Sequence, residues 1–154
     1  MRLLRVYTDS SVLGGCRDIE FEVDSLRLIH WARRRELTLL ISEITLRELE
    51  AAPSELEAIL SDIAPDGLEF VPLTTEIFAL RDACVRAGVV GPQCLNDAAH
   101  VAAATVARAD AIVSWNFKPI VRLEKIRGYN QVNESYSSLA IITPREGRLD
   151  ESDN

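Results

Sequence analysis

The chain has 154 residues, of which 47% are hydrophobic and 27% charged, and this composition predicts one soluble globular domain. Its formal net charge of −7 disfavours indiscriminate binding to nucleic acid or to anionic membranes. No apolar run approaches the roughly 20 residues that a membrane span needs. Three cysteines without CxxC spacing indicate neither a disulfide framework nor a zinc site. Arg2, Arg5 and Asp9 interrupt the first apolar stretches, unlike in a signal peptide, and the cysteine pattern leads us to expect a reducing cytoplasm as the compartment.

Short apolar runs alternate with segments of helical periodicity along the chain. The first run ends in a polar cluster that contains Asp9, and Gly14 and Gly15 then interrupt the chain. Strands that alternate with helices favour a parallel sheet covered on both faces, so the predicted fold class is α/β, a three-layer α/β/α sandwich with a mainly parallel sheet. In chain order, the pattern predicts a strand over 3–7, a helix over 25–35, a strand over 37–41, helices over 43–52 and 53–64, a strand over 68–73, a helix over 75–88, a helix over 97–107, a strand over 111–114, a short helix from 117 and a strand over 139–143.

Polar side chains follow several predicted strands, at the sheet edge where parallel α/β proteins form their sites. Asp9 follows the first strand, Asp97 opens the alanine-rich helix, and Asn116 lies two residues beyond the strand 111–114. Each also has a purely structural interpretation. Asp9 could bond neighbouring turn amides, Asp97 could interact with the helix dipole, and Asn116 could cap the helix from 117.

Glu48 lies within the predicted helix 43–52, on the same stripe as Ile44 and Ala51. A carboxylate on a buried stripe is costly unless another group offsets its charge. Glu43 and Arg47 take the outer face, where they can pair in water, so Glu43 is the second choice for a functional acid.

Asp9, Glu48 and Asp97 are therefore predicted to converge at one edge of the sheet. Like charges about 4 Å apart cost several kcal/mol, so the cluster needs a shared proton or a divalent cation. Ligands that are all oxygen favour Mg²⁺ or Mn²⁺ over zinc. His100, one helical turn beyond Asp97, is either a packed core residue or a further ligand.

Four segments of the chain form a set of motifs in a fixed order: VYTDSSV (6–12), ISEITLREL (41–49), NDAAHVA (96–102) and DAIVSWNF (110–117). Taken together and in this order, they resemble the PIN-domain ribonucleases, and VapC-like toxins of bacterial toxin–antitoxin pairs in particular. The resemblance runs from about residue 5 to 146 and implies a PIN-like nuclease domain over 1–146, followed by an acidic tail over 147–154.

The resemblance implies an endoribonuclease that depends on Mg²⁺ or Mn²⁺. The family's three acids fall on Asp9, Glu48 and Asp97, and Ser11 matches a hydroxyl position next to the first acid. The family's fourth position, usually an aspartate, falls on Asn116. This departure removes one negative charge, so one ion would be held well and a second one poorly.

The hypothesis is metal-assisted hydrolysis of phosphodiester bonds. Asp9 and Asp97 would hold the ion, Glu48 would ligate it or orient the attacking water, and Asn116 would position a water at the ion. By resemblance, the products are a 5′-phosphate and a 3′-hydroxyl, and the partners are an RNA substrate, a small antitoxin protein and a second copy of the chain in a homodimer. The candidate substrate-binding residues are Ser11, Ser114, Lys118 and Arg122, with Arg127 as a further cation along the RNA.

The basic residues gather in the C-terminal part of the chain. Residues 108–148 have a local charge balance of +3, against −7 for residues 1–107, and 15 of the 17 cations are arginine. Arginine suits phosphate because its planar fork of donors matches phosphate oxygens. A solvated surface and a base composition that favours arginine codons are the alternative explanations.

Three other functions compete with the nuclease. A PIN-like module that binds RNA or protein with little catalysis is motivated by Asn116 and by the acidic surface. A phosphoacceptor domain with Asp9 in an acid pocket is disfavoured, because Glu48 would then be a needless buried charge. A dinucleotide-binding fold is excluded, because Gly14 and Gly15 lack the GxGxxG spacing.

Overall fold

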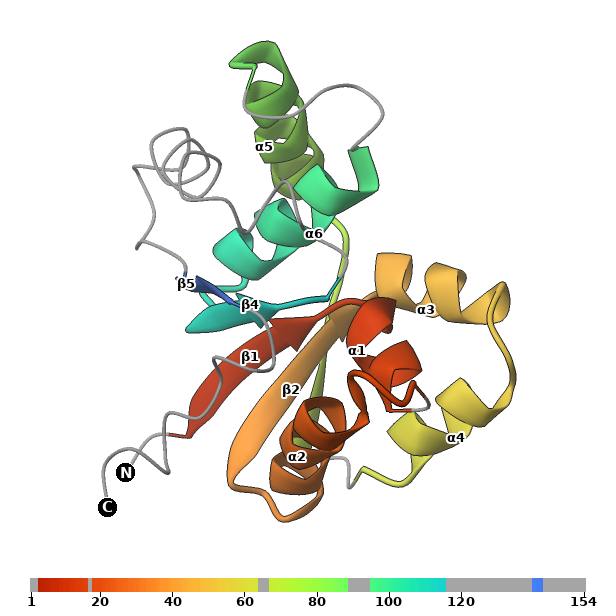
Figure 1. Cartoon of the computed structure of the whole chain (residues 1–154). Helices are drawn as coiled ribbons and strands as arrows, with labels where there is room; N and C mark the ends of the chain where they lie inside the picture. Colours follow the sequence, from red (N-terminus) through yellow and green to blue (C-terminus); the bar gives the residue numbers. More distant parts are fainter. Residues whose placement is uncertain (1–2, 17, 64–66, 89–94, 116–139, 143–154) are drawn as a thin grey trace.

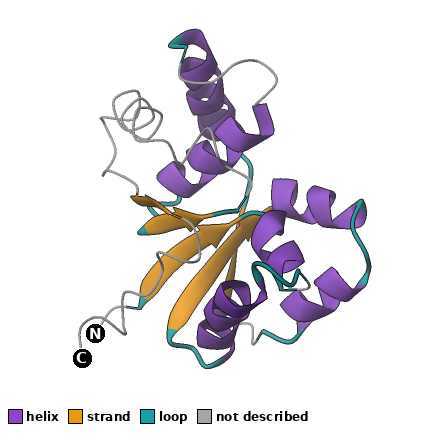
Figure 2. Cartoon of the chain, viewed as in Figure 1, coloured by secondary structure: helices purple, strands orange, loops and turns teal. Residues whose placement is uncertain are grey.

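The computed structural model describes residues 3–16, 18–63, 67–88, 95–115 and 140–142. Within them, a five-stranded sheet has the order β3-β2-β1-β4-β5, and every pair of neighbouring strands is parallel. Helices α5 and α6 cover one face, and α1, α2 and α4 cover the other (Figures 1 and 2), which confirms the predicted three-layer fold. The elements are β1 (Leu4–Thr8), α1 (Ser10–Gly15), α2 (Glu22–Arg33), β2 (Leu37–Ser42), α3 (Glu43–Glu50), α4 (Glu55–Ser61), β3 (Leu68–Val71), α5 (Thr75–Arg86), α6 (Leu95–Val106), β4 (Ala111–Val113) and β5 (Ala140–Ile142).

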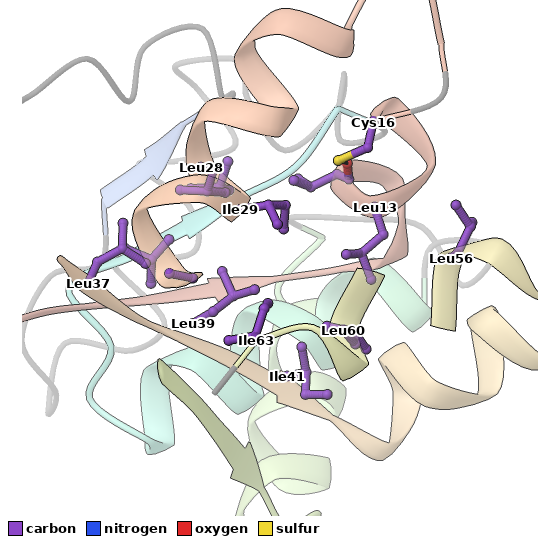
Figure 3. Close-up of a cluster of buried hydrophobic side chains, with 14 of the residues drawn as sticks. Leu13, Cys16, Leu28, Ile29, Leu37, Leu39, Ile41, Leu56, Leu60 and Ile63 are labelled. Atoms are coloured by element: carbon purple, nitrogen blue, oxygen red, sulfur yellow. Dashed lines mark hydrogen bonds between the residues drawn. The ribbon is translucent and has the colours of Figure 1, made fainter. Parts of the chain in front are cut away.

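Side chains of the central strands alternate between two apolar clusters, one on each face of the sheet. Val6 and Leu39 pack with α1, α2 and α4, whereas Tyr7 and Leu40 pack with α5 and α6. Figure 3 shows the first cluster, in which Leu39 of β2 lies among side chains of these helices. Because a slip of one residue would exchange the two sets of side chains, this alternation fixes the register of the strands.

The register of the sheet brings the ends of β1 and β4 together. Thr8, the last residue of β1, pairs with Val113, the last residue of β4. Asp9 and Ser114 therefore leave the sheet side by side. Strands β2 and β3 extend from one side of β1, and β4 and β5 from the other. The two residues thus lie at the point where the strand order reverses, which is where sites form in such sheets.

The first connection differs from its prediction. Gly14 and Gly15, which were expected to interrupt the chain, lie in helix α1, which begins directly after Asp9. Asp9 caps this helix by accepting the N–H of Ser11, and this bond starts the helix before the glycines are reached. Gly88, by contrast, has the expected role, with a φ of 75° just beyond α5. In the part of the chain that the structure describes, no helix has the length and hydrophobicity of a membrane span.

Candidate functional site

Asp9 is buried at the end of β1, with 2% of its surface exposed, and neighbouring hydroxyls hold its carboxylate. Ser11 donates to Asp9 Oδ1 from its backbone nitrogen at 3.0 Å and from its hydroxyl at 2.6 Å. Ser114 donates its hydroxyl to Oδ2 at 2.7 Å. Trp115 in turn donates its backbone N–H to Ser11 Oγ at 2.8 Å. Ser11 and Ser114, which were predicted to bind substrate, thus contact the first acid. Asp9 also bonds a neighbouring backbone amide, which is the structural role that its position suggested.

Glu48 extends from α3 toward Asp9 and is half-buried. Its Oε1 accepts the Ser10 hydroxyl at 3.0 Å and the Ser10 backbone N–H at 3.4 Å, and it lies 3.1 Å from His100 Nε2. Glu43 is exposed and pairs with Arg47 at 3.0 Å. Glu48 thus lies inward and Glu43 outward, as predicted. Helical periodicity was sufficient for this prediction, because residues three or four apart share one face of a helix.

Asp97 is the third residue of α6 and is also half-buried. Within the described residues, no hydrogen bond reaches its carboxylate. Burial raises the pKa of Asp97 from 3.8 to about 6, opposed by the charge of His100 and reinforced by the negative charges of Asp9 and Glu48. The three acids therefore act on one another electrostatically, although they come from three different elements.

His100 lies at the centre of the site and is fully buried. Its Nε2 contacts Glu48, and its Nδ1 lies 2.7 Å from the Tyr7 hydroxyl, which lies 2.7 Å from Ser42 Oγ. His100 is thus a packed residue, as one of the two interpretations expected, with both ring nitrogens in hydrogen bonds. Its contacts with Glu48 and Tyr7 were not predicted. The only signal was its position one turn after Asp97, on the helix face that meets the sheet.

The electrostatics of the three acids differ. Burial raises the pKa of Asp9, and the hydrogen bonds from Ser11 and Ser114 only partly oppose this effect. Burial would also raise the pKa of Glu48, but the contacts with His100 and Ser10 outweigh it and lower the pKa. The folded protein therefore disfavours the ionised forms of Asp9 and Asp97. A bound cation would stabilise these ionised forms through its positive charge.

The donor set fits a hard divalent cation in chemistry and charge, since three carboxylates supply only oxygen ligands. Their present arrangement does not enclose an ion. Among the described residues, no three Asp, Glu, His or Cys side chains form a group that could hold a metal. Within the described residues, the Asp97 carboxylate and Glu48 Oε2 accept no hydrogen bond, because the hydrogen bonds of Glu48 all end on Oε1.

Several predicted site residues lie outside the described residues, so the structure does not place them. These residues are Asn116, Lys118, Arg122 and Arg127.

Comparisons with known proteins support the fold. No protein-family model matches the chain. No curated protein matches its sequence. The structure is similar to a chain in the crystal structure of VapBC2 from Rickettsia felis bound to a DNA fragment from their promoter, with a TM-score of 0.54 and 16% sequence identity over 91% of this chain and 98% of that chain. The chain therefore has a VapC-like PIN fold, as the resemblance of its motifs predicted.

Proposed function

We propose that this chain is an endoribonuclease that depends on Mg²⁺ or Mn²⁺ and acts as the toxin of a toxin–antitoxin pair. The observation that carries the proposal is the placement of three acids at the end of β1: Glu48 accepts the hydroxyl of Ser10, the residue after Asp9, and contacts His100, which lies one helical turn beyond Asp97. Such a cluster fits a divalent cation better than it fits a set of purely structural acids, because two of its members are held at raised pKa values. The likeness of the fold to a chain of a VapBC complex supports the same function.

Each acid has a separate part in the proposed reaction. Asp9 and Asp97 would hold the cation, and Ser11 and Ser114 would keep the Asp9 carboxylate in place. When bound, the cation lowers the pKa of a water molecule and offsets negative charge that develops on the phosphate. Glu48 would ligate the ion or orient the attacking water through Oε2.

The remaining roles are proposals on residues outside the described part of the chain. Asn116 would position a water at the ion, and Lys118 and Arg122 would bind the RNA backbone. We also propose a small antitoxin protein as partner, a homodimer as the assembly and the cytoplasm as the location.

RNA cleavage with and without Mn²⁺ tests the enzymatic proposal. We expect wild-type protein to cleave RNA only with the ion, and Asp9→Asn, Asp97→Asn and Glu48→Gln to lose most of this activity. Glu43→Gln is the matched control, because it removes an exposed acid from the same helix and should retain activity. Cleavage that survives Asp9→Asn and Asp97→Asn, or that occurs equally in EDTA, would refute the assignment.

A PIN-like binding module is the second candidate function. It is favoured by Asn116, which stands where the family that the motifs resemble usually has an aspartate, and by the net charge of −7. This function predicts that RNA or a protein partner binds equally well with EDTA and with Mn²⁺, without cleavage. Expression in a bacterial host tests the toxin role: wild-type protein should arrest growth, and Asp9→Asn should not.

A further inference from the structure

A series of buried hydrogen bonds leads to Glu48 and has no part in the proposed hydrolysis. Ser42 lies at the end of β2, Tyr7 on β1 and His100 on α6, and all three are fully buried. Ser42 Oγ contacts the Tyr7 hydroxyl at 2.7 Å, this hydroxyl contacts His100 Nδ1 at 2.7 Å, and His100 Nε2 reaches Glu48 Oε1 at 3.1 Å. The series thus joins three elements of the core to one carboxylate of the site.

The donors and acceptors of this series are complementary. Glu48 accepts only, so His100 Nε2 donates to it whatever the charge of the ring. In the neutral ring, Nδ1 accepts the Tyr7 proton, and Tyr7 accepts the Ser42 proton. In the charged ring, both of these bonds reverse. Every group therefore has a partner in either state, as buried polar groups require.

The same contacts restrict the orientation of the imidazole and of the carboxylate. The Tyr7 and His100 rings meet edge to face, with centroids 5.6 Å apart. His100 and Ser10 both bind Glu48 Oε1, so a long side chain with several rotamers is held at one of its two oxygens. Within the described residues, Oε2 accepts no hydrogen bond and is available for another ligand.

We propose that His100, held by Tyr7 and Ser42, is a positioning residue that orients Glu48 so that Oε2 can serve the cation or the attacking water. This inference rests on the proposed nuclease function. His100 itself touches neither group, because both of its nitrogens already have partners. A merely structural role would make the same contacts important for folding and irrelevant to ion binding.

Mn²⁺ affinity of the full chain, measured by electron paramagnetic resonance, tests the proposal without catalysis. Tyr7→Phe keeps the ring and removes the hydroxyl, and His100→Gln keeps an amide donor near the position of Nε2. We expect each variant to bind Mn²⁺ about ten- to a hundredfold more weakly, which is typical for loss of a residue that orients a metal ligand. His30→Gln, at an exposed position on α2, is the control and should bind like wild type.

Kinetics and a double-mutant cycle separate positioning from folding. Because neither residue contacts RNA in the proposal, kcat should fall by a similar factor and KM for RNA should stay unchanged. In a Glu48→Gln background, Tyr7→Phe should weaken Mn²⁺ binding no further, since the effect acts through Glu48. An equal loss in both backgrounds, together with lower thermal stability, would overturn the positioning role.

The two proposals can fail separately. If wild-type protein binds Mn²⁺ and cleaves RNA, while Tyr7→Phe and His100→Gln match it in affinity and kcat, only the positioning role is refuted. If wild-type protein neither binds Mn²⁺ nor cleaves RNA, the nuclease function is refuted and the positioning role with it. Thermal unfolding of each variant identifies any variant that does not fold. If His100→Gln does not fold, Tyr7→Phe, which keeps the packing of the aromatic ring, decides whether the positioning role holds.

Discussion

Asp97→Asn is expected to stabilise the metal-free protein at pH 7.5 while it abolishes Mn²⁺ binding. The variant replaces a half-buried carboxylate, to which no described residue donates a hydrogen bond, with a neutral amide of nearly the same shape. In the folded protein, the ionised carboxylate is opposed first by burial and then by the charges of Asp9 and Glu48. Removal of the charge relieves both effects, at the expense of a metal ligand.

The size of the effect follows from the pKa of Asp97, which is raised from 3.8 to about 6. At about 1.4 kcal/mol per pKa unit, this difference corresponds to about 3 kcal/mol. Because the side chain is only half-buried, solvent screening reduces the value to about 1.5 kcal/mol. The ionised acid also gains about 0.3–1 kcal/mol from the dipole at the start of α6, which the variant loses. The expected net stabilisation is therefore about 1 kcal/mol.

Urea denaturation in EDTA at pH 7.5 and at pH 5 measures this difference. A carboxyl whose pKa is higher in the folded than in the unfolded state destabilises the protein progressively as pH rises from about 4 to 6. The advantage of Asp97→Asn should therefore be largest at pH 7.5 and smaller at pH 5. The control is Asp62→Asn, which removes an exposed acid that lies 3.5 Å from Arg33 and should change stability by less than about 0.5 kcal/mol. A variant less stable than wild type at pH 7.5, or equally favoured at both pH values, would refute this electrostatic explanation.

Three further predictions concern the site and the core beside it. Mn²⁺ affinity should fall as pH drops below about 6, because Asp97 then takes up a proton; an affinity that stays constant between pH 5 and 8 would contradict this. Ser114→Ala should lower the free energy of unfolding by about 1.5–3 kcal/mol in urea titrations, because it removes a hydrogen bond to the buried carboxylate at the end of β1; a change below about 0.5 kcal/mol would show that this bond contributes little. Gly15→Ala should destabilise the protein by about 1–3 kcal/mol, because the new Cβ would lie 2.4 Å from Ser25 Oγ. Urea titrations of both variants check this, because Gly14→Ala should instead stabilise α1 by about 0.5–1 kcal/mol. Among the described residues, no atom beyond the local helix backbone lies within 4 Å of its added Cβ, and equal effects of the two substitutions would argue against this packing.

The fold was predictable because its signals are local. Short apolar runs between helical segments indicated a parallel sheet with helices on both faces, and the sheet is parallel throughout its described strands. The same local reasoning placed Glu48 inward and Glu43 outward, since three to four residues separate neighbours on a helix face. Helix α1 was missed because Gly14 and Gly15 suggest a break, whereas the capping bond of Asp9 starts the helix before them.

Local patterns along the chain indicate which residue types stand at the ends of the strands, and hence the carboxylates of the candidate site. Strand ends can be recognised from neighbouring residues, and parallel strands bring their carboxyl ends to one edge of the sheet. The contacts of Tyr7 with His100, 93 residues away, and of His100 with Glu48, 52 residues away, are visible only in the folded chain. Such contacts depend on how α6 and α3 pack at the end of β1, and periodicity within one segment carries no information about packing between distant segments.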